Sequence, residues 1–202
     1  MPVTIGDGGL ADFDKPIELM KDCHRRIERF LGVLLDVTEQ ADGRELSDEA
    51  ESALRTALDY FDGAAPLHTA DEERSLFPRM RSNGDARVAA AMSEIARLES
   101  DHRDAETAHA HVEELGRRWL EERLLAEPTR ARLRQLLVDL QRRYREHIRE
   151  EEQRIFPLAE RVLDTSQLQA VGKEMKQRRI VRPGRADSRC AQRRRELFQQ
   201  ER

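Results

Sequence analysis

Residues 68–78 read HTADEERSLFP, and residues 147–157 read HIREEEQRIFP. The histidine, two glutamates, the phenylalanine and the proline recur at the same offsets, and Asp71 is matched by Glu150. Each stretch places a charged run inside a segment whose flanking apolar residues have helical spacing. Because a charged segment of this length rarely repeats by chance, the sequence predicts that one structural unit occurs twice.

Four long segments have the periodicity of amphipathic helices. Asp14 and Pro16 are expected to be the cap and first-turn proline of the first helix, and Ser47 is expected to cap the second. Gly63 and Pro66 predict a kink or short break in the second helix. The expected helices cover, in chain order, residues 16–40, 47–82, 86–125 and 128 to about 164. Short links between such helices predict an all-α, up-down-up-down four-helix bundle built from two similar helical hairpins.

The composition excludes several other classes of protein. Charged residues make up 38% of the 202 residues and aromatic residues only 4%, which favours helices over strands. No apolar window is long enough for a membrane span, and the N-terminus lacks the pattern of a secretory signal. The two cysteines, Cys23 and Cys190, are too few for a disulfide framework, so the cytoplasm is the expected location.

The charge is distributed unevenly along the chain. The net charge is −4, yet residues 173–202 hold 11 Lys or Arg and 4 Asp or Glu. We therefore expect three regions: an N-terminal extension over 1–13, the bundle over 14–164, and a basic, partly disordered tail over 165–202. A solvated tail is the simplest interpretation, and contact with nucleic acid or an acidic partner is the alternative.

Each predicted helix carries one His-x-x-x-Glu pair, whose members lie on one helical face. The pairs are His24 and Glu28, His68 and Glu72, His102 and Glu106, and His147 and Glu151. Buried imidazoles and carboxylates are costly unless they bind something. Four such pairs turned inward form a ligand set for two metal ions, in which carboxylates can bridge the ions. Pro78 and Pro157 are expected to end or bend their helices just past this site.

These motifs resemble those of hemerythrin-like proteins with an HHE cation-binding domain. The resemblance covers about residues 14–164 and rests on DCHRRIERF, HTADEERSLFP, DHRDAE and HIREEEQRIFP. It implies a non-haem di-iron site in a four-helix bundle, with carboxylate and oxo or hydroxo bridges. The implied terminal ligands are His24, His68, His102 and His147, and the implied bridges are Glu72 and Glu151.

Glu106 departs from the pattern of oxygen-carrying hemerythrins, which have a histidine at this position. As a ligand, an anionic glutamate stabilises ferric iron, which disfavours reversible oxygen storage. We expect a redox role that involves oxygen or peroxide and an external electron donor, because no flavin or nicotinamide fingerprint is present. The alternatives are a sensor of oxygen, nitric oxide or iron that signals through the basic tail, and a metal-free helical scaffold.

Several neighbouring residues receive a structural interpretation. Glu28 is expected to stay off the metal, since it would fill the position that an exogenous ligand needs. Glu73 and Glu152 lie about 100° around the helix from Glu72 and Glu151, so we expect them to be solvated or paired with arginine. His109 and Cys23 are expected to have packing roles, with hydrogen bonding to the metal ligands as the alternative for His109. For Glu106 the alternative to ligation is likewise a hydrogen bond to a ligand.

Overall fold

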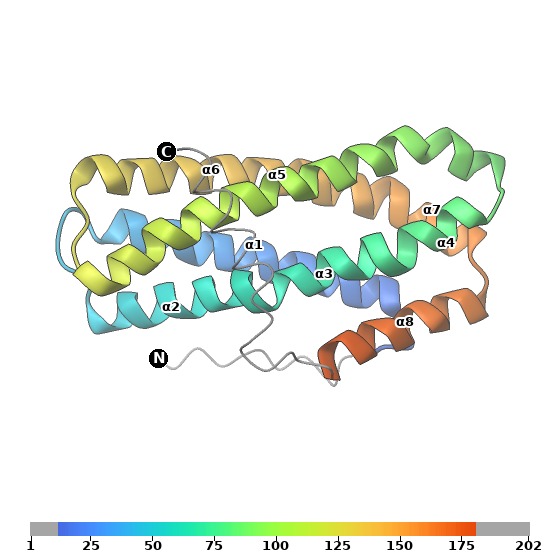
Figure 1. Ribbon diagram of the computed structural model, residues 1–202, viewed down its shortest axis with the longest axis horizontal. Helices are drawn as coiled ribbons and strands as arrows, with labels where there is room; N and C mark the ends of the chain where they lie inside the picture. Colours follow the sequence, from blue (N-terminus) through green and yellow to red (C-terminus); the bar gives the residue numbers. More distant parts are fainter. Residues whose placement is uncertain (1–11, 181–202) are drawn as a thin grey trace, which may run out of the picture.

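The computed structural model describes residues 12–180, which form helices joined by short connections and include no strand. The first and third helices of the bundle are continuous, and the second and fourth are each divided into several segments (Figure 1). The elements are α1 (Pro16–Gln40), α2 (Asp48–Gly63), α3 (Ala65–Asp71), the π-helical η1 (Glu72–Leu76), α4 (Phe77–Ser82), α5 (Ala86–Glu122), α6 (Glu127–Glu150), the π-helical η2 (Glu151–Ile155), α7 (Phe156–Val162) and α8 (Thr165–Ile180).

The predicted up-down-up-down arrangement is confirmed. Helix α1 packs against α2 and α6, and α5 packs against the same two helices, so that α1 and α5 lie on opposite corners of the bundle. The expected break in the second helix occurs at Ala64, the residue between α2 and α3. Ser47 caps α2, as predicted, by accepting a hydrogen bond from the Ala50 backbone N–H at 3.2 Å.

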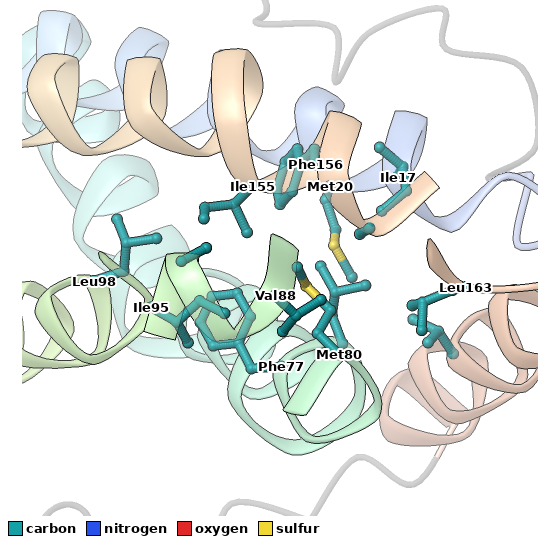
Figure 2. Close-up of a cluster of buried hydrophobic side chains, with 14 of the residues drawn as sticks. Ile17, Met20, Phe77, Met80, Val88, Ile95, Leu98, Ile155, Phe156 and Leu163 are labelled. Atoms are coloured by element: carbon teal, nitrogen blue, oxygen red, sulfur yellow. The ribbon is translucent and has the colours of Figure 1, made fainter. Parts of the chain in front are cut away.

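Two apolar clusters fill the bundle, one toward each end. One cluster joins the start of α1 and α5 to α4, α7 and α8, and Figure 2 shows the side chains of Met20, Phe77, Ile95 and Phe156 within it. The other joins the later part of α1 and α5 to α2 and α6. Each fully buried Leu, Ile, Met or Phe side chain contributes roughly 1.5–3 kcal/mol to stability. A layer of buried polar side chains separates the two apolar clusters.

The third helix ends earlier than the sequence predicts. Helix α5 stops at Glu122 rather than near Leu125, because Arg123 adopts a left-handed conformation with φ of 57°. The Arg123 guanidinium donates a hydrogen bond of 2.6 Å to the Leu46 carbonyl, which fixes the turn beside the start of α2.

Pro78 and Pro157, which were expected to end or bend their helices, are followed by further helix up to Ser82 and Val162. A π-helical turn precedes each proline, in which the N–H of Phe77 bonds to the carbonyl of Glu72, and the N–H of Phe156 to that of Glu151. Each proline therefore lies in the first turn of a new α-helix, where a missing N–H is tolerated.

Residues 165–180, which the sequence assigned to the basic tail, are helical. These residues form α8, which packs against α1, α3 and η1 and buries Val171, Gly172 and Met175 (Figure 1). A side chain at Gly172 would lie 1.8 Å from the Phe13 carbonyl oxygen, so only glycine fits there. The rest of the predicted tail, residues 181–202, and most of the N-terminal extension lie outside the described residues.

Helix α8 is attached to the bundle by charge as well as by apolar contact. Asp71, which is fully buried, accepts hydrogen bonds from Arg178 at 2.8 Å and from Arg179 at 2.7 Å. Glu174 of α8 also binds Arg79 at 2.7 Å. Among residues 12–180 no helix is both long and apolar enough to cross a membrane.

Candidate metal centre

The polar layer of the bundle consists of four histidines and two glutamates. His24 lies on α1, His102 on α5, and the other two histidines, His68 and His147, lie one turn before η1 and η2. Glu72 and Glu151 are the first residues of η1 and η2 and have no exposed surface. The side chains form two groups able to hold a cation: His24, His68, Glu72 and Glu151 in one, and His102, His147 and Glu151 in the other.

The two carboxylates each face histidines from both hairpins. One oxygen of Glu151 lies 3.1 Å from His24 Nε2, and its other oxygen lies 3.1 Å from His147 Nε2. Glu72 presents Oε1 to His68 Nε2 at 3.3 Å and Oε2 to His102 Nε2 at 3.4 Å. Each carboxylate thus divides its two oxygens between one histidine pair and the other.

Several buried atoms of this layer lack hydrogen-bond partners. Both oxygens of Glu72, both oxygens of Glu151 and Nε2 of His24 are buried without one. The Nε2 atoms of His102 and His147 face each other at 3.0 Å. A buried carboxylate without donors costs several kcal/mol, on the order of the cost of an isolated buried ion. Bound cations would satisfy all of these atoms, so the residues present fit a metal site.

The pKa values of two histidines in this layer also show that the buried carboxylates favour positive charge beside them. Burial by itself lowers the pKa of His24, but the carboxylates of Glu151 and Glu72 outweigh it and raise the pKa to about 11. The pKa of His102 is likewise lowered by burial but raised overall, to about 10, by Glu72 and Glu73. Without a metal ion, protons on these two rings balance the two buried carboxylates.

The other ionisable groups of the layer follow from the same environment. Burial lowers the pKa of His68 to about 4, against the attraction of Glu72, so this ring is neutral at pH 7. Burial raises the pKa of Glu72, yet His68, His102 and His24 hold it well below its usual value. Burial and Glu72 raise the pKa of Glu151, but His147 and His24 lower it overall. Both glutamates are therefore anionic and ready to bind a cation.

Glu73 and Glu152 have a role that the sequence interpretation missed. They were expected to be solvated or paired with arginine, but Glu73 accepts a hydrogen bond from His102 Nδ1 at 2.9 Å, and Glu152 accepts one from His24 Nδ1 at 2.8 Å. Each bond crosses from one hairpin to the other. The repeat singles out Glu73 and Glu152, because both glutamates of each pair recur at the same offsets, but it does not identify the histidines that they contact.

Glu106 and Glu28 lie outside the two groups. Both side chains are exposed, and neither joins the histidines and glutamates that converge within ligand distance of one another. Glu106 lies one turn beyond His102 on the wall of a cavity that reaches the centre. Of the predicted ligands, the structure brings together His24, His68, Glu72, His102, His147 and Glu151, and it leaves Glu106 at the rim.

The cavity has a volume of about 540 Å³ and reaches all four histidines. Its inner wall includes Tyr144 and His109, whose side chains lie 3.0 Å apart, and Phe61 stacks on His109 with ring centroids 4.5 Å apart. His109 therefore bonds to Tyr144 within the cavity wall, in addition to packing against the bundle. The sequence did not predict this cavity.

The fold and the site define a protein of the hemerythrin class, and comparison with known families agrees. Residues 15–159 match the hemerythrin HHE cation binding domain, and the chain belongs to this family. It is also similar to a protein of Haemophilus influenzae that is described as uncharacterised. The two sequences are 30% identical over 173 residues, which cover 85% of this chain and 94% of that protein.

Proposed function

We propose that this protein is a non-haem di-iron protein that binds or reacts with oxygen or peroxide. The observation that carries the proposal is the division of the Glu72 and Glu151 oxygens between two histidine pairs. One ion beside His24 and His68, and a second beside His102 and His147, would each receive an oxygen from both carboxylates. Mixed imidazole and carboxylate ligands suit iron, and bundle cores that bind two irons use this kind of set.

The glutamates of the centre would have two different roles. Glu72 and Glu151 would bind and neutralise the ions, while Glu73 and Glu152 would fix the orientation of His102 and His24. Iron would supply the redox chemistry, since two ions can exchange two electrons with an oxidant. The cavity would admit the oxidant to the histidine face of the centre, and the reductant would be an external electron donor.

Glu106 remains a proposed ligand on the His102 side. It lies on the cavity wall one turn beyond His102 and outside both ligand groups, so its side chain would have to move to reach an ion. If it does ligate, its charge favours ferric iron, which supports turnover of oxygen or peroxide rather than reversible oxygen storage.

The first test is metal analysis and peroxide consumption. We expect about two iron ions per chain after expression with iron, as in other di-iron bundles, and consumption of added peroxide when a reductant is supplied. A protein that takes up no metal would contradict the proposal. A protein that holds iron but only binds and releases oxygen over repeated cycles would show binding without turnover.

One observation favours a sensor as the second candidate. Asp71, which directly precedes Glu72, is held by Arg178 and Arg179 of α8, the last described helix before the basic C-terminal residues. A sensor would pass a change at the centre to α8 through this contact. Hydrogen exchange of the oxidised and reduced protein tests it: a sensor requires that the difference be larger in α8 than in α2.

A further inference from the structure

The cavity beside the centre is larger than a diatomic gas or hydrogen peroxide needs. Its volume of about 540 Å³ lies within the range of roughly 300–1,000 Å³ that is usual for sites of small organic molecules. A single water molecule occupies only about 30 Å³ in the liquid. The space therefore fits an organic molecule as well as an oxidant.

The internal repeat shows how the chain makes this space. Three residues on α3 and α5 that line the cavity are small, and their counterparts in the other hairpin are large. When the two hairpins are superimposed in sequence by matching His68 to His147 and His102 to His24, the small and large residues pair as Ala65 and Tyr144, Thr69 and Ile148, and Ala105 and Ile27. The large members belong to α1 and α6, which pack along each other. The small members leave the equivalent face, between α3 and α5, open.

The inside of the cavity is mainly apolar. Ile27, Phe61 and Ile148 lie along it, and the Tyr144 hydroxyl is engaged with His109 at 3.0 Å. The four histidines of the centre also line the cavity. Such a wall favours a hydrocarbon body that displaces water from the surfaces of these side chains.

The mouth of the cavity carries two arginines. Arg74 and Arg103 line it from η1 and α5 and are exposed, and within residues 12–180 neither guanidinium has an ion pair with a carboxylate. Glu73, at the same mouth, is bound to His102, and Glu106 lies one turn beyond Arg103. Guanidinium groups bind carboxylates through paired, charge-assisted hydrogen bonds. An anionic group on the ligand would therefore form hydrogen bonds with these two guanidinium groups.

We propose that the cavity binds an organic carboxylic acid with an apolar body. The carboxylate lies at Arg74 and Arg103, and the hydrocarbon extends along Phe61, Ile27 and Ile148 toward the histidines. This inference names the organic substrate class of the same centre, and it rests on the proposed function for the chemistry but not for the binding.

The test is titration of the metal-loaded full chain with dodecanoate, followed by calorimetry. We expect one saturable site per chain, with dodecylammonium binding at least about tenfold more weakly, a difference of about 1.4 kcal/mol. The double variant Arg74→Glu with Arg103→Glu should weaken dodecanoate binding by about tenfold or more. Arg132→Glu is the matched control, because Arg132 is exposed on α6, away from the cavity lining, and should change the affinity less than about twofold.

A second variant tests the space without changing charge. Thr69→Ile with Ala105→Ile installs the residues of the other hairpin and should weaken dodecanoate binding by about tenfold or more through the lost volume, with metal content retained. Absence of saturable binding to the wild type, or equal effects of the Arg74/Arg103 variant and Arg132→Glu, would overturn the inference. A protein that holds metal but not dodecanoate refutes only this inference. One that binds dodecanoate without ever taking up metal refutes the proposed function instead.

Discussion

Glu72 and Glu151 each face imidazoles from both halves of the chain. Their oxygens lie 3.1 to 3.4 Å from ring nitrogens and have no hydrogen-bond donor. Loss of either carboxylate would remove one oxygen from both proposed cation positions at once.

We therefore predict that Glu151→Ala lowers the metal content to less than about one ion per chain, because both positions of a two-metal site would lose a ligand. Elemental analysis of the purified variant measures this. Glu28→Ala is the control, because Glu28 is exposed and outside both groups, and it should bind metal like the wild type. Equal metal loss in the two variants would show that Glu151 is not a ligand.

Glu73 and Glu152 act through the histidines that they hold. Glu73→Ala or Glu152→Ala should lower metal affinity by about 10–100-fold, the usual effect of removing a carboxylate that orients a ligating histidine. Competition with a chelator measures the affinity. Glutamine at the same positions should restore part of it, because its amide oxygen still accepts the Nδ1 hydrogen bond. Affinities indistinguishable from Glu28→Ala would contradict a positioning role.

The raised pKa values of His24 and His102 predict an alkaline weakness of the metal-free protein. Their pKa values, about 11 and about 10 in the folded protein, lie above the value of 6.5 for an unperturbed histidine. The stability that they contribute is fully present below pH 6.5 and is lost as pH rises through the folded pKa values. The Tm of the chelated protein should therefore fall between pH 7 and pH 10. The metal-loaded protein should lack this component of the fall, and identical pH profiles would contradict the assignment.

At the scale of single elements, helix starts are easier to predict than helix ends and π-helical turns. Pro16 and Ser47 mark the observed starts of α1 and α2, because a first-turn proline and a capping side chain act on near neighbours. The predicted cap at Asp14 is wrong, since the N-cap residue of α1 is Lys15 and no side chain caps this helix. The end of α5 depends on the hydrogen bond from Arg123 to Leu46, which are far apart in sequence. Local periodicity cannot reveal such a contact.

The sequence did not predict helix α8, because this helix too is held by contacts with residues that are far away in the sequence. Its buried apolar residues are few, and its packing relies on Gly172 against Phe13 and on arginines that pair with Asp71. A run rich in lysine and arginine with a weak apolar stripe is typical of a solvated tail, unless a buried partner carboxylate exists elsewhere in the fold.

We predict that Arg178→Ala combined with Arg179→Ala lowers the free energy of unfolding by about 3–5 kcal/mol, because Asp71 would remain buried without a counter-charge. Burial already raises the pKa of Asp71 against the attraction of Arg179 and Arg178, so the carboxylate depends on both partners. Urea denaturation measures the change. Lys176→Ala, at an exposed position of the same helix, should alter stability by less than about 0.5 kcal/mol. A similar small loss in the double variant would mean that α8 is held by its apolar contacts alone.

At the scale of the whole molecule, the duplication visible in the sequence was enough to predict the bundle and the convergence of the four histidines, Glu72 and Glu151. Helical spacing places a side chain on a face, and a repeat places two such faces against each other. The sequence could not predict the partners of Glu73 and Glu152, the exposed position of Glu106 or the cavity. These features depend on contacts between residues that are far apart in the sequence, which no local pattern encodes.

Metal removal should destabilise the whole bundle, because the centre joins all four of its helices. The chelated protein should melt at a lower temperature than the metal-loaded protein, since ligand binding to the native state adds to its stability. Differential scanning calorimetry at pH 7 measures both. Coincident melting curves for samples of known and different metal content would show that the centre binds no cation.

The crossed hydrogen bonds of Glu73 and Glu152 mean that neither hairpin contains a complete centre, since each supplies the outer partner of the other's histidine. Two separate copies of one hairpin could assemble the same centre only as a symmetric dimer, and such a dimer would have either two identical entrances or none. Fusion into one chain removes that restriction. It allows Ala65, Thr69 and Ala105 to open one side while Tyr144, Ile148 and Ile27 fill the other, so that an oxidant and an organic ligand would share the same cavity beside the proposed metal centre.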